Sequence, residues 1–186
     1  GAPGEHRIDP GARAAWAAEL AALVCSEVPR AHPEQWWALR QVTSARAPWP
    51  GTIVVDIDKR QLALVQADGT AVQYGVGVGK LGFSWKGQAR VGRKGVWPDW
   101  SPTTTMVSLN PDLPRTRKGG VDNPLGARAL YLADGTGKDT LYRIHGTNEP
   151  ETIGQAVSSG CIRMTNKDVV DLYDRAKVGT KVVVRN

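Results

Sequence analysis

The sequence predicts a mainly β-sheet domain preceded by a small α-helical segment. After Gly51, apolar and polar residues alternate in short runs separated by turn residues, a pattern typical of strands. These runs do not alternate with long helical patterns, so a parallel βαβ architecture is not indicated. Helical spacing recurs only before residue 43 and after Thr165. We therefore expect a helical segment with a linker over residues 1–49 and the main domain over residues 50–186.

The N-terminal part carries two helical patterns. Asp9-Pro10 is typical of a helix start, and apolar residues recur at helical spacing from there to about Val28. A second helix is expected from Pro33 to about Val42, carrying two tryptophans. We interpret these tryptophans as packing against the main domain, with a small appendage for docking a substrate or partner as the alternative. Residues 43–50 have the composition of a linker.

The first part of the main domain predicts an antiparallel meander. Strand patterns cover residues 52–57, 61–66 and 71–78, and turn signals at Asp58-Lys59 and Asp68-Gly69 separate them. Glycines alternate near the end of the third run. A dinucleotide site would need such glycines between a strand and a helix, and no helical pattern follows them. We therefore predict no nucleotide site here.

The stretch 80–128 is rich in glycine, proline, tryptophan and basic residues, and it predicts a long irregular segment. Irregular segments of this length inside a compact domain are commonly lids or cleft walls. We expect this one to form part of a substrate cleft, with its basic residues facing an anionic substrate. A solvated loop is the alternative.

The last part of the domain predicts two strands, a helix and a final strand. Residues 129–133 and 141–144 have strand patterns, and the second run ends at His145. A helix is expected from Thr165 to about Ala176, because Thr165 and Asp168 have the spacing of a capping box. Residues 180–185 then predict the last strand.

Composition limits the classes of function. The chain has 186 residues, a net charge of +6 and 41% hydrophobic residues, as expected for one soluble domain with a small appendage. No apolar run approaches the roughly 20 residues that span a bilayer. The basic residues are scattered and do not alternate with aromatic residues, so we expect no nucleic-acid partner. No leader is visible at the start, and a mature form would also lack one.

One stretch has the composition of a thiol active site. Cys161 follows Ser159-Gly160, and His145 lies upstream of it. A cysteine attacks as thiolate, and a nearby imidazole is the usual means of forming it near neutral pH. A glycine lets the backbone approach a substrate closely, and the N–H groups of Gly160 and Cys161 could converge on an oxyanion. The alternative is a buried structural cysteine beside a satisfied histidine.

The remaining cysteine and histidines indicate neither a disulfide nor a metal site. Cys25 lies in an alanine-rich helical pattern, and we interpret it as a small buried apolar residue. The three histidines are not closely spaced, and no Cys-x-x-Cys pair is present. We expect no metal and no cofactor.

Several motifs together resemble the L,D-transpeptidase (YkuD-like) catalytic family. The active-site signature is carried by His145-Gly146-Thr147, by Ile153-Gly154 and by the run from Ser158 to Met164. Further similar segments extend the resemblance to roughly residues 50–185, and they lie at 53–57, 76–80, 122–126, 166–168 and 179–183. One departure is Ser159, where many members carry a histidine. Ser-Ser-Gly-Cys is a known variant, so we still expect activity.

The resemblance implies a β-sandwich-like domain that acts on peptidoglycan stem peptides. Cys161 would attack the carbonyl of the third residue of a tetrapeptide stem, release D-Ala and pass the acyl group to an amine. His145 would accept the thiol proton and later protonate the leaving amine. Gly160 and Cys161 would supply oxyanion donors, with Ser159 as a further candidate. Gly146 and Thr147 would hold His145 in its orientation.

Substrate contacts are expected from Arg163, Asn123 and Tyr142. If its segment is extended, Arg163 shares a face with Cys161, and its guanidinium suits a stem-peptide carboxylate. The alternative for Arg163 is an ion pair with Asp168 or Asp171. Ser158 is expected to be structural, through a backbone hydrogen bond.

Other functions stay open at this point. An L,D-carboxypeptidase would use the same thiol with water as acceptor, and a non-catalytic wall-binding module would not need the Cys–His pair. Papain-like peptidases fit poorly, because in them the cysteine precedes the histidine. The resemblance also implies acylation by carbapenem-type β-lactams and an exported, periplasmic or wall-associated location. The acyl acceptor, the physiological role (a toxin aimed at a rival's wall among the possibilities) and the oligomeric state are not indicated.

Overall fold

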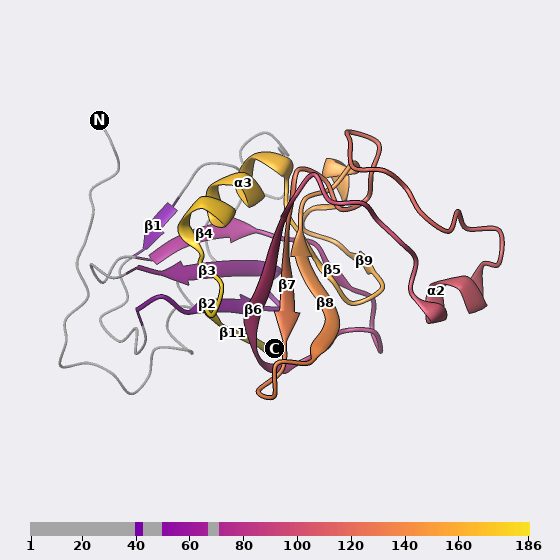
Figure 1. Cartoon of the computed structure of the whole chain (residues 1–186). Helices are drawn as coiled ribbons and strands as arrows, with labels where there is room; N and C mark the ends of the chain where they lie inside the picture. The colour runs from indigo at the N-terminus through magenta and orange to yellow at the C-terminus, as the bar shows by residue number, and fades with distance from the viewer. Residues whose placement is uncertain (1–39, 43–49, 67–70) are drawn as a thin grey trace.

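The computed structural model describes residues 40–42, 50–66 and 71–186 (Figure 1). Two helices and one 3-10 helix lie among the described residues: α2 (Thr104–Leu109), η2 (Pro150–Thr152) and α3 (Asn166–Arg175). The strands are β1 (Arg40–Val42), β2 (Ile53–Asp56), β3 (Gln61–Val65), β4 (Ala71–Gly75), β5 (Val78–Gly79), β6 (Gly87–Val96), β7 (Arg128–Ala133), β8 (Asp139–His145), β9 (Ala156–Ser158), β10 (Ile162–Arg163) and β11 (Lys181–Arg185). Strands therefore dominate this part of the chain, as predicted.

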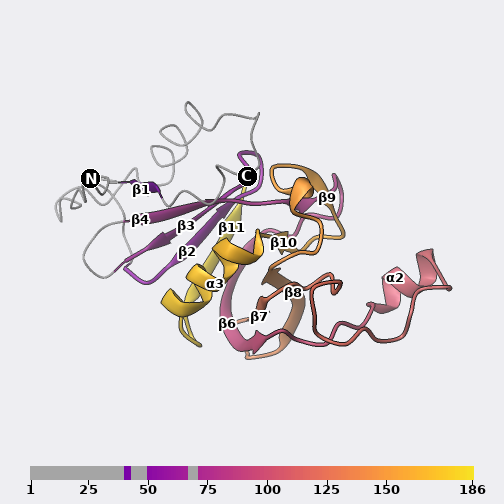
Figure 2. The ribbon, with the colours of Figure 1, turned by 90° about the horizontal axis from the view of Figure 1, so that it is seen from above.

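Nine of these strands form one sheet in the order β1-β4-β3-β2-β11-β6-β7-β8-β10, and β5 pairs with β9 beside it. Most neighbours are antiparallel, but β11 pairs with β2 and β10 pairs with β8 in parallel. The group β2–β4 and the group β6–β8 run in clearly different directions, with β11 joining them (Figures 1 and 2). The sheet thus bends around a core instead of lying flat.

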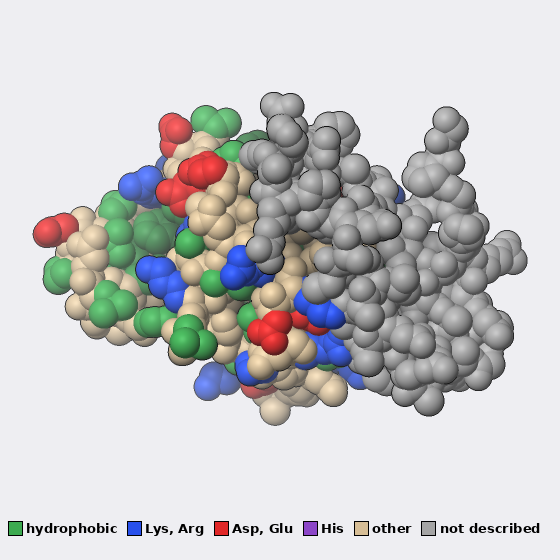
Figure 3. All heavy atoms as spheres, turned by 180° about the vertical axis from the view of Figure 1, so that it is seen from behind, with side chains coloured by type: hydrophobic (Ala, Val, Ile, Leu, Met, Phe, Trp, Pro, Cys, Tyr) green, Lys and Arg blue, Asp and Glu red, His purple; other side chains and the backbone are tan. Residues whose placement is uncertain are grey.

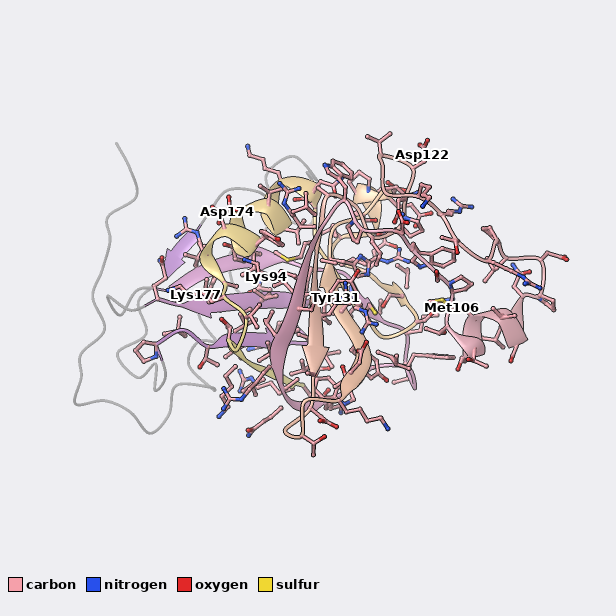
Figure 4. The ribbon with its side chains drawn as sticks, viewed as in Figure 1. Lys94, Met106, Asp122, Tyr131, Asp174 and Lys177 are labelled. Carbon is pink, nitrogen blue, oxygen red and sulfur yellow. The ribbon has the colours of Figure 1, made fainter. Side chains whose placement is uncertain are left out.

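The core is enclosed by the two parts of the sheet and α3. Valine, leucine and isoleucine side chains from both parts form one buried cluster with Val169 and Leu172 of α3. Thr165 caps this helix, because its hydroxyl accepts the Asp168 N–H at 3.1 Å. At the other end, the ammonium of Lys94 on β6 donates to the last carbonyls of the helix (Figure 4). Helix α3 is thereby capped at its start and tied to β6 at its end.

Several predicted elements are confirmed. The meander of β2, β3 and β4 is antiparallel, β7 and β8 follow as expected, and α3 and β11 end the chain. The third predicted strand is divided, since β4 ends at Gly75 and the short β5 pairs with β9. No helix in the described part of the chain is long and apolar enough to cross a bilayer.

Two predictions of local structure are wrong. Residues 87–96 were expected to be irregular but form β6, which pairs with both β11 and β7. Only Ala89 and Val91 of this strand are buried, so its many glycines and charges concealed the alternation. Residues 40–42 were expected to end a helix but form β1, paired with β4. The rest of the predicted N-terminal helices, Cys25, the linker at 43–49 and the Asp68-Gly69 turn lie outside the described residues.

Residues 97–127 form an arm that projects from the sheet and carries α2 (Figures 1 and 2). Its base is closed by Trp100 and Arg117, whose backbone groups bond reciprocally at 2.8 Å. No residue of α2 is buried, and Leu109 and Val107 are among the exposed apolar residues. Hydrophobic side chains are accordingly visible over this end of the molecule (Figure 3). Within the predicted irregular stretch, residues 80–86 and most of the arm lack regular secondary structure, as expected.

Candidate active site

The parallel pairing of β8 and β10 brings the predicted site residues onto one face of the sheet. Ile162 is paired with Ile144, and Arg163 is paired with His145. Cys161, which directly precedes β10, is therefore level with Arg143. Side chains alternate along a strand, so these four polar residues share one face while the isoleucines point into the core. The thiol and the imidazole occupy diagonal positions, with a guanidinium at each of the other two.

Cys161 lies at the end of a tight turn and is a partly exposed free thiol. Gly160 has a φ of +124°, and a side chain there would lie 2.6 Å from both the Phe83 carbonyl oxygen and the Tyr142 ring. Only glycine fits this conformation and this close approach. Burial raises the pKa of the Cys161 thiol, while the N–H of Arg143 and the nearby guanidinium groups lower it.

Ser158 holds the turn together. Its hydroxyl donates to the Cys161 carbonyl at 2.7 Å and accepts the Gly160 N–H at 3.1 Å. The structural role predicted for Ser158 is confirmed. The same contact corrects the expectation for Gly160, because an N–H bonded to a buried hydroxyl is not free to bind an oxyanion. Ser159, between them, is exposed.

His145 is buried at the end of β8, and its orientation is set by the backbone. The ring Nδ1 lies 2.5 Å from the Gly146 carbonyl oxygen. Because a carbonyl can only accept, Nδ1 carries the hydrogen, and Nε2 is left as the proton acceptor. Burial lowers the pKa of His145 to about 4, so the imidazole is neutral at neutral pH.

The loop after His145 is fixed by Asn166, a residue to which the sequence assigned no site role. The Asn166 side-chain oxygen accepts the N–H groups of Ala127 at 2.9 Å and Thr147 at 3.2 Å. A side chain on Gly146 would lie 2.2 Å from that oxygen, so a glycine is required there. The hydroxyl of Thr147 in turn accepts the Glu149 N–H. Asn166 directly follows the predicted helix cap Thr165, and this position was the sequence feature that could have pointed to its role.

Arg163 forms an ion pair, but not with the acids that the sequence suggested. Its guanidinium lies 3.1 Å from the Glu149 carboxylate, and this carboxylate is half exposed. Asp171 instead accepts from the Tyr74 hydroxyl and the Arg175 guanidinium. The proposed pairing with Asp168 or Asp171 is therefore wrong, whereas a substrate contact by Arg163 stays a prediction.

Asn123 supports the arm and does not face a substrate. The residue is 1% exposed, and its amide nitrogen donates to the carbonyls of Pro98, Arg117 and Lys118. Its oxygen accepts the Leu125 N–H at 2.8 Å. Both polar atoms are thus used within the protein, and we correct the expected substrate contact to a structural role.

Tyr142 lies beside the nucleophile turn, on the side of residues 80–86. Its ring stacks on Trp85 with a centroid distance of 5.4 Å. The backbone of Gly79 also packs closely against this turn, because a side chain on Gly79 would lie 2.8 Å from the Gly160 Cα. The two aromatic rings thus support the turn that presents Cys161.

The comparisons with known proteins identify the family. The family model of the YkuD L,D-transpeptidase catalytic domain matches residues 50–184. The probable L,D-transpeptidase YbiS of Escherichia coli K12 is 34% identical over 140 residues, which cover 71% of this chain and 43% of that protein. The chain therefore belongs to the YkuD L,D-transpeptidase catalytic domain family. It aligns with less than half the length of this relative.

Solved structures support the fold. A crystal structure from Brucella melitensis, of a protein described as a probable carnitine operon oxidoreductase, is 44% identical with a TM-score of 0.53. The match covers 83% of this chain and 100% of the Brucella chain. L,D-transpeptidase 3 from Mycobacterium tuberculosis, solved with a faropenem-derived adduct, is 16% identical with a TM-score of 0.57, over 73% of this chain and 60% of that one. The family assignment rests on the family model and on YbiS.

Proposed function

We propose that this domain is a peptidoglycan L,D-transpeptidase with Cys161 as its nucleophile. The observation that carries the proposal is the shared sheet face of β8 and β10, which presents a thiol, an imidazole and two guanidinium groups together. Family membership supports the reaction class, and the site residues supply a consistent chemistry for it.

The first half-reaction forms a thioester. The Cys161 sulfur attacks the carbonyl carbon of the third stem residue, and the thiol proton passes to Nε2 of His145. The resulting imidazolium then donates this proton to the nitrogen of D-Ala as the C–N bond breaks. An amine acceptor next attacks the thioester carbonyl and gives a proton to His145, which returns it to the departing sulfur. One difficult amide exchange is thereby divided into two easier steps.

The protonation states of the pair favour general-base catalysis. Burial raises the pKa of Cys161 and lowers that of His145 to about 4, so both groups rest neutral near pH 7. Proton transfer then accompanies attack on the substrate instead of preceding it. A neutral imidazole is ready to act as the base throughout the neutral range, which suits this role.

The developing oxyanion would be stabilised by the N–H of Cys161. The Gly160 N–H is held by Ser158, whereas no acceptor for the Cys161 N–H is found within the described part of the chain. The exposed Ser159 is a further candidate donor. Removing one donor of this kind commonly lowers kcat by about 100- to 1000-fold.

Arg163 is assigned to a carboxylate of the stem peptide, and Tyr142 with Trp85 to an apolar wall beside the nucleophile turn. Glu149 would then be a resting partner that the substrate carboxylate replaces.

With water in place of the amine, the same residues would act as an L,D-carboxypeptidase. With peptidoglycan as the substrate, we infer an exported protein that is periplasmic or associated with the wall.

Incubation with purified tetrapeptide muropeptides, followed by mass spectrometry, tests the proposal. We expect loss of D-Ala and appearance of a cross-linked or amine-exchanged product. Cys161→Ala should abolish both, and Cys25→Ser is the matched control that should keep them. Persistent turnover in folded Cys161→Ala would falsify the assignment of the nucleophile.

A β-lactam supplies a second readout that needs no acceptor. Imipenem or faropenem should give a single covalent adduct by intact-protein mass spectrometry, and Cys161→Ala should give none. The expectation rests on a thiol placed to attack a strained amide. A folded protein that stays unmodified at millimolar drug would argue against an accessible acylation site.

A further inference from the structure

A row of paired residues crosses the site face of the sheet and ends at the nucleophile. Arg93 of β6 pairs with Tyr131 of β7, and Tyr131 pairs with Arg143 of β8. Cys161 comes next to Arg143, one residue before the β10 ladder begins. Figure 4 shows Tyr131 on β7, between β6 and β8. The guanidinium nearest to Cys161 along this row is thus that of Arg143, and the reaction proposed above gives it no task.

Arg143 is fixed by several contacts. Two of its nitrogens contact the two carboxylate oxygens of Asp139 at 2.7 and 3.1 Å, and one also donates to the Tyr142 carbonyl. Its guanidinium lies 4.7 Å from the centre of the Tyr131 ring, which Arg93 covers at 3.6 Å. Arg143 is 17% exposed and Asp139 is 48% exposed. A positive charge is therefore held rigidly beside the thiol, and its counter-ion lies toward solvent.

We propose that Arg143 and Asp139 are a positioning pair that sets how readily Cys161 gives up its proton, with Arg143 favouring the thiolate and Asp139 opposing it. The proposal rests on the function proposed above only in taking Cys161 as the reacting thiol. Neither residue contacts the substrate in this scheme. Both act through the charge that they place beside the sulfur.

The charges that face Cys161 are those of Arg143, Asp139 and Arg163, beside the imidazole of His145. Arg143 contributes twice, since its N–H is directed at the sulfur and its guanidinium adds a positive charge. Arg163 acts in the same sense but is paired with Glu149. Asp139 acts in the opposite sense, and burial keeps His145 neutral. The two partners of one ion pair should therefore have opposite effects on the pKa of the thiol.

The test is the pH dependence of Cys161 alkylation by iodoacetamide, measured by intact-protein mass spectrometry in a Cys25→Ser background. Arg143→Gln should move the inflection up by about half to one pH unit and slow alkylation at pH 7 about three- to tenfold. Asp139→Asn should move it down by a similar amount and accelerate alkylation. The asparagine keeps the side-chain oxygen that accepts the Leu141 N–H at 2.8 Å.

Arg93→Gln is the matched control, because it removes a guanidinium from the same tyrosine ring at a greater distance from the thiol. It should leave the inflection unchanged, and Arg143→Lys should lie between the wild type and Arg143→Gln. Shifts of the same sign for Arg143→Gln and Asp139→Asn, or an Arg93→Gln shift as large as that of Arg143→Gln, would overturn the proposal. If Arg143→Gln does not fold, the direction of the Asp139→Asn shift decides by itself.

Alkylation requires only the thiol, so this test is separate from that of the transpeptidase reaction. Opposite shifts in a protein that turns over no muropeptide would support the charge pair and count against the substrate. Normal turnover without opposite shifts would support the transpeptidase reaction and overturn the charge pair.

Discussion

The two faces of β8 and β10 are built from alternate residues of the same short segments, yet they differ in almost every property. One face contributes Ile144, Ile162 and the adjoining Met164 to the buried cluster beneath α3. The other carries His145, whose ring donates to the Gly146 carbonyl, and Cys161, whose backbone carbonyl accepts the Ser158 hydroxyl. The difference shows that the period of a strand can separate the residues that stabilise a site from those that react in it.

The comparison makes opposite predictions for the two faces. Apolar residues on the core face lose transfer and packing free energy when shortened, whereas the polar face is organised by hydrogen bonds to the backbone. Substitutions on the core face should therefore change stability, and those on the polar face should change chemistry.

The largest expected effect on stability is that of Met164→Ala. Met164 is completely buried, so the change should lower the free energy of unfolding by about 2–5 kcal/mol. Activity per folded molecule should stay near that of the wild type. Urea unfolding and muropeptide turnover measure the two quantities. Cys161→Ala should show the reverse, with a stability change within about 1 kcal/mol and no thioester. Equal stability losses in the two variants would contradict the division between faces.

An intermediate effect is expected at Arg163. If it binds a stem carboxylate, Arg163→Ala should lower kcat/KM by about ten- to a hundredfold, equivalent to the loss of about 1.5–3 kcal/mol. Arg163→Lys should recover little, since it lacks the two-point contact. The ion pair with the half-exposed Glu149 is worth at most about 1 kcal/mol, so the melting temperature should change little.

Glu149→Gln is the control for Arg163, because it breaks the same ion pair and keeps the guanidinium. Its kcat/KM should equal or exceed that of the wild type. A loss as large as that of Arg163→Ala would assign the effect to the ion pair and remove Arg163 from the substrate contacts.

The smallest of these effects is expected at Asp168, on the core side of α3. Burial raises its pKa to about 7, and one of its oxygens is buried without a partner in the described structure. In the unfolded chain its pKa is near 3.8, so the folded state binds this proton more tightly. Keeping the carboxylate ionised therefore destabilises the fold above pH 7, and this cost falls as the pH drops from 7 towards 4.

Asp168→Asn should accordingly raise the stability at pH 8 by about 1–2 kcal/mol, since a pKa difference of one corresponds to about 1.4 kcal/mol and local relaxation recovers part of the cost. The advantage should shrink near pH 5. His145 has the opposite effect, because its lowered pKa makes the fold lose stability as the pH falls from 6.5 towards 4. The measurement therefore compares the stability of the variant with that of the wild type at each pH, so that the contribution of His145 cancels. A pH-independent difference would assign the effect to packing.

The sequence alone determined the features that depend on local pattern. Alternation located β2, β3, β7 and β8, and the strand that became β8 was expected to deliver His145 at its end. The Thr165 cap placed the start of α3. Motifs identified the family. These succeed because periodicity, capping and turn chemistry act between residues only a few positions apart.

Only the tertiary structure decided which residues meet. The register of β8 against β10 places Arg143 beside Cys161, and the partner of Arg163 is Glu149. The amide of Asn123 donates to carbonyls of the arm, and the N–H of Gly160 donates to the Ser158 hydroxyl. Strand β6 exists because β11 and β7 lie on its two sides, whatever its own composition suggests. Such pairings are set by long-range packing and hydrogen bonding, which composition and spacing along the chain do not record.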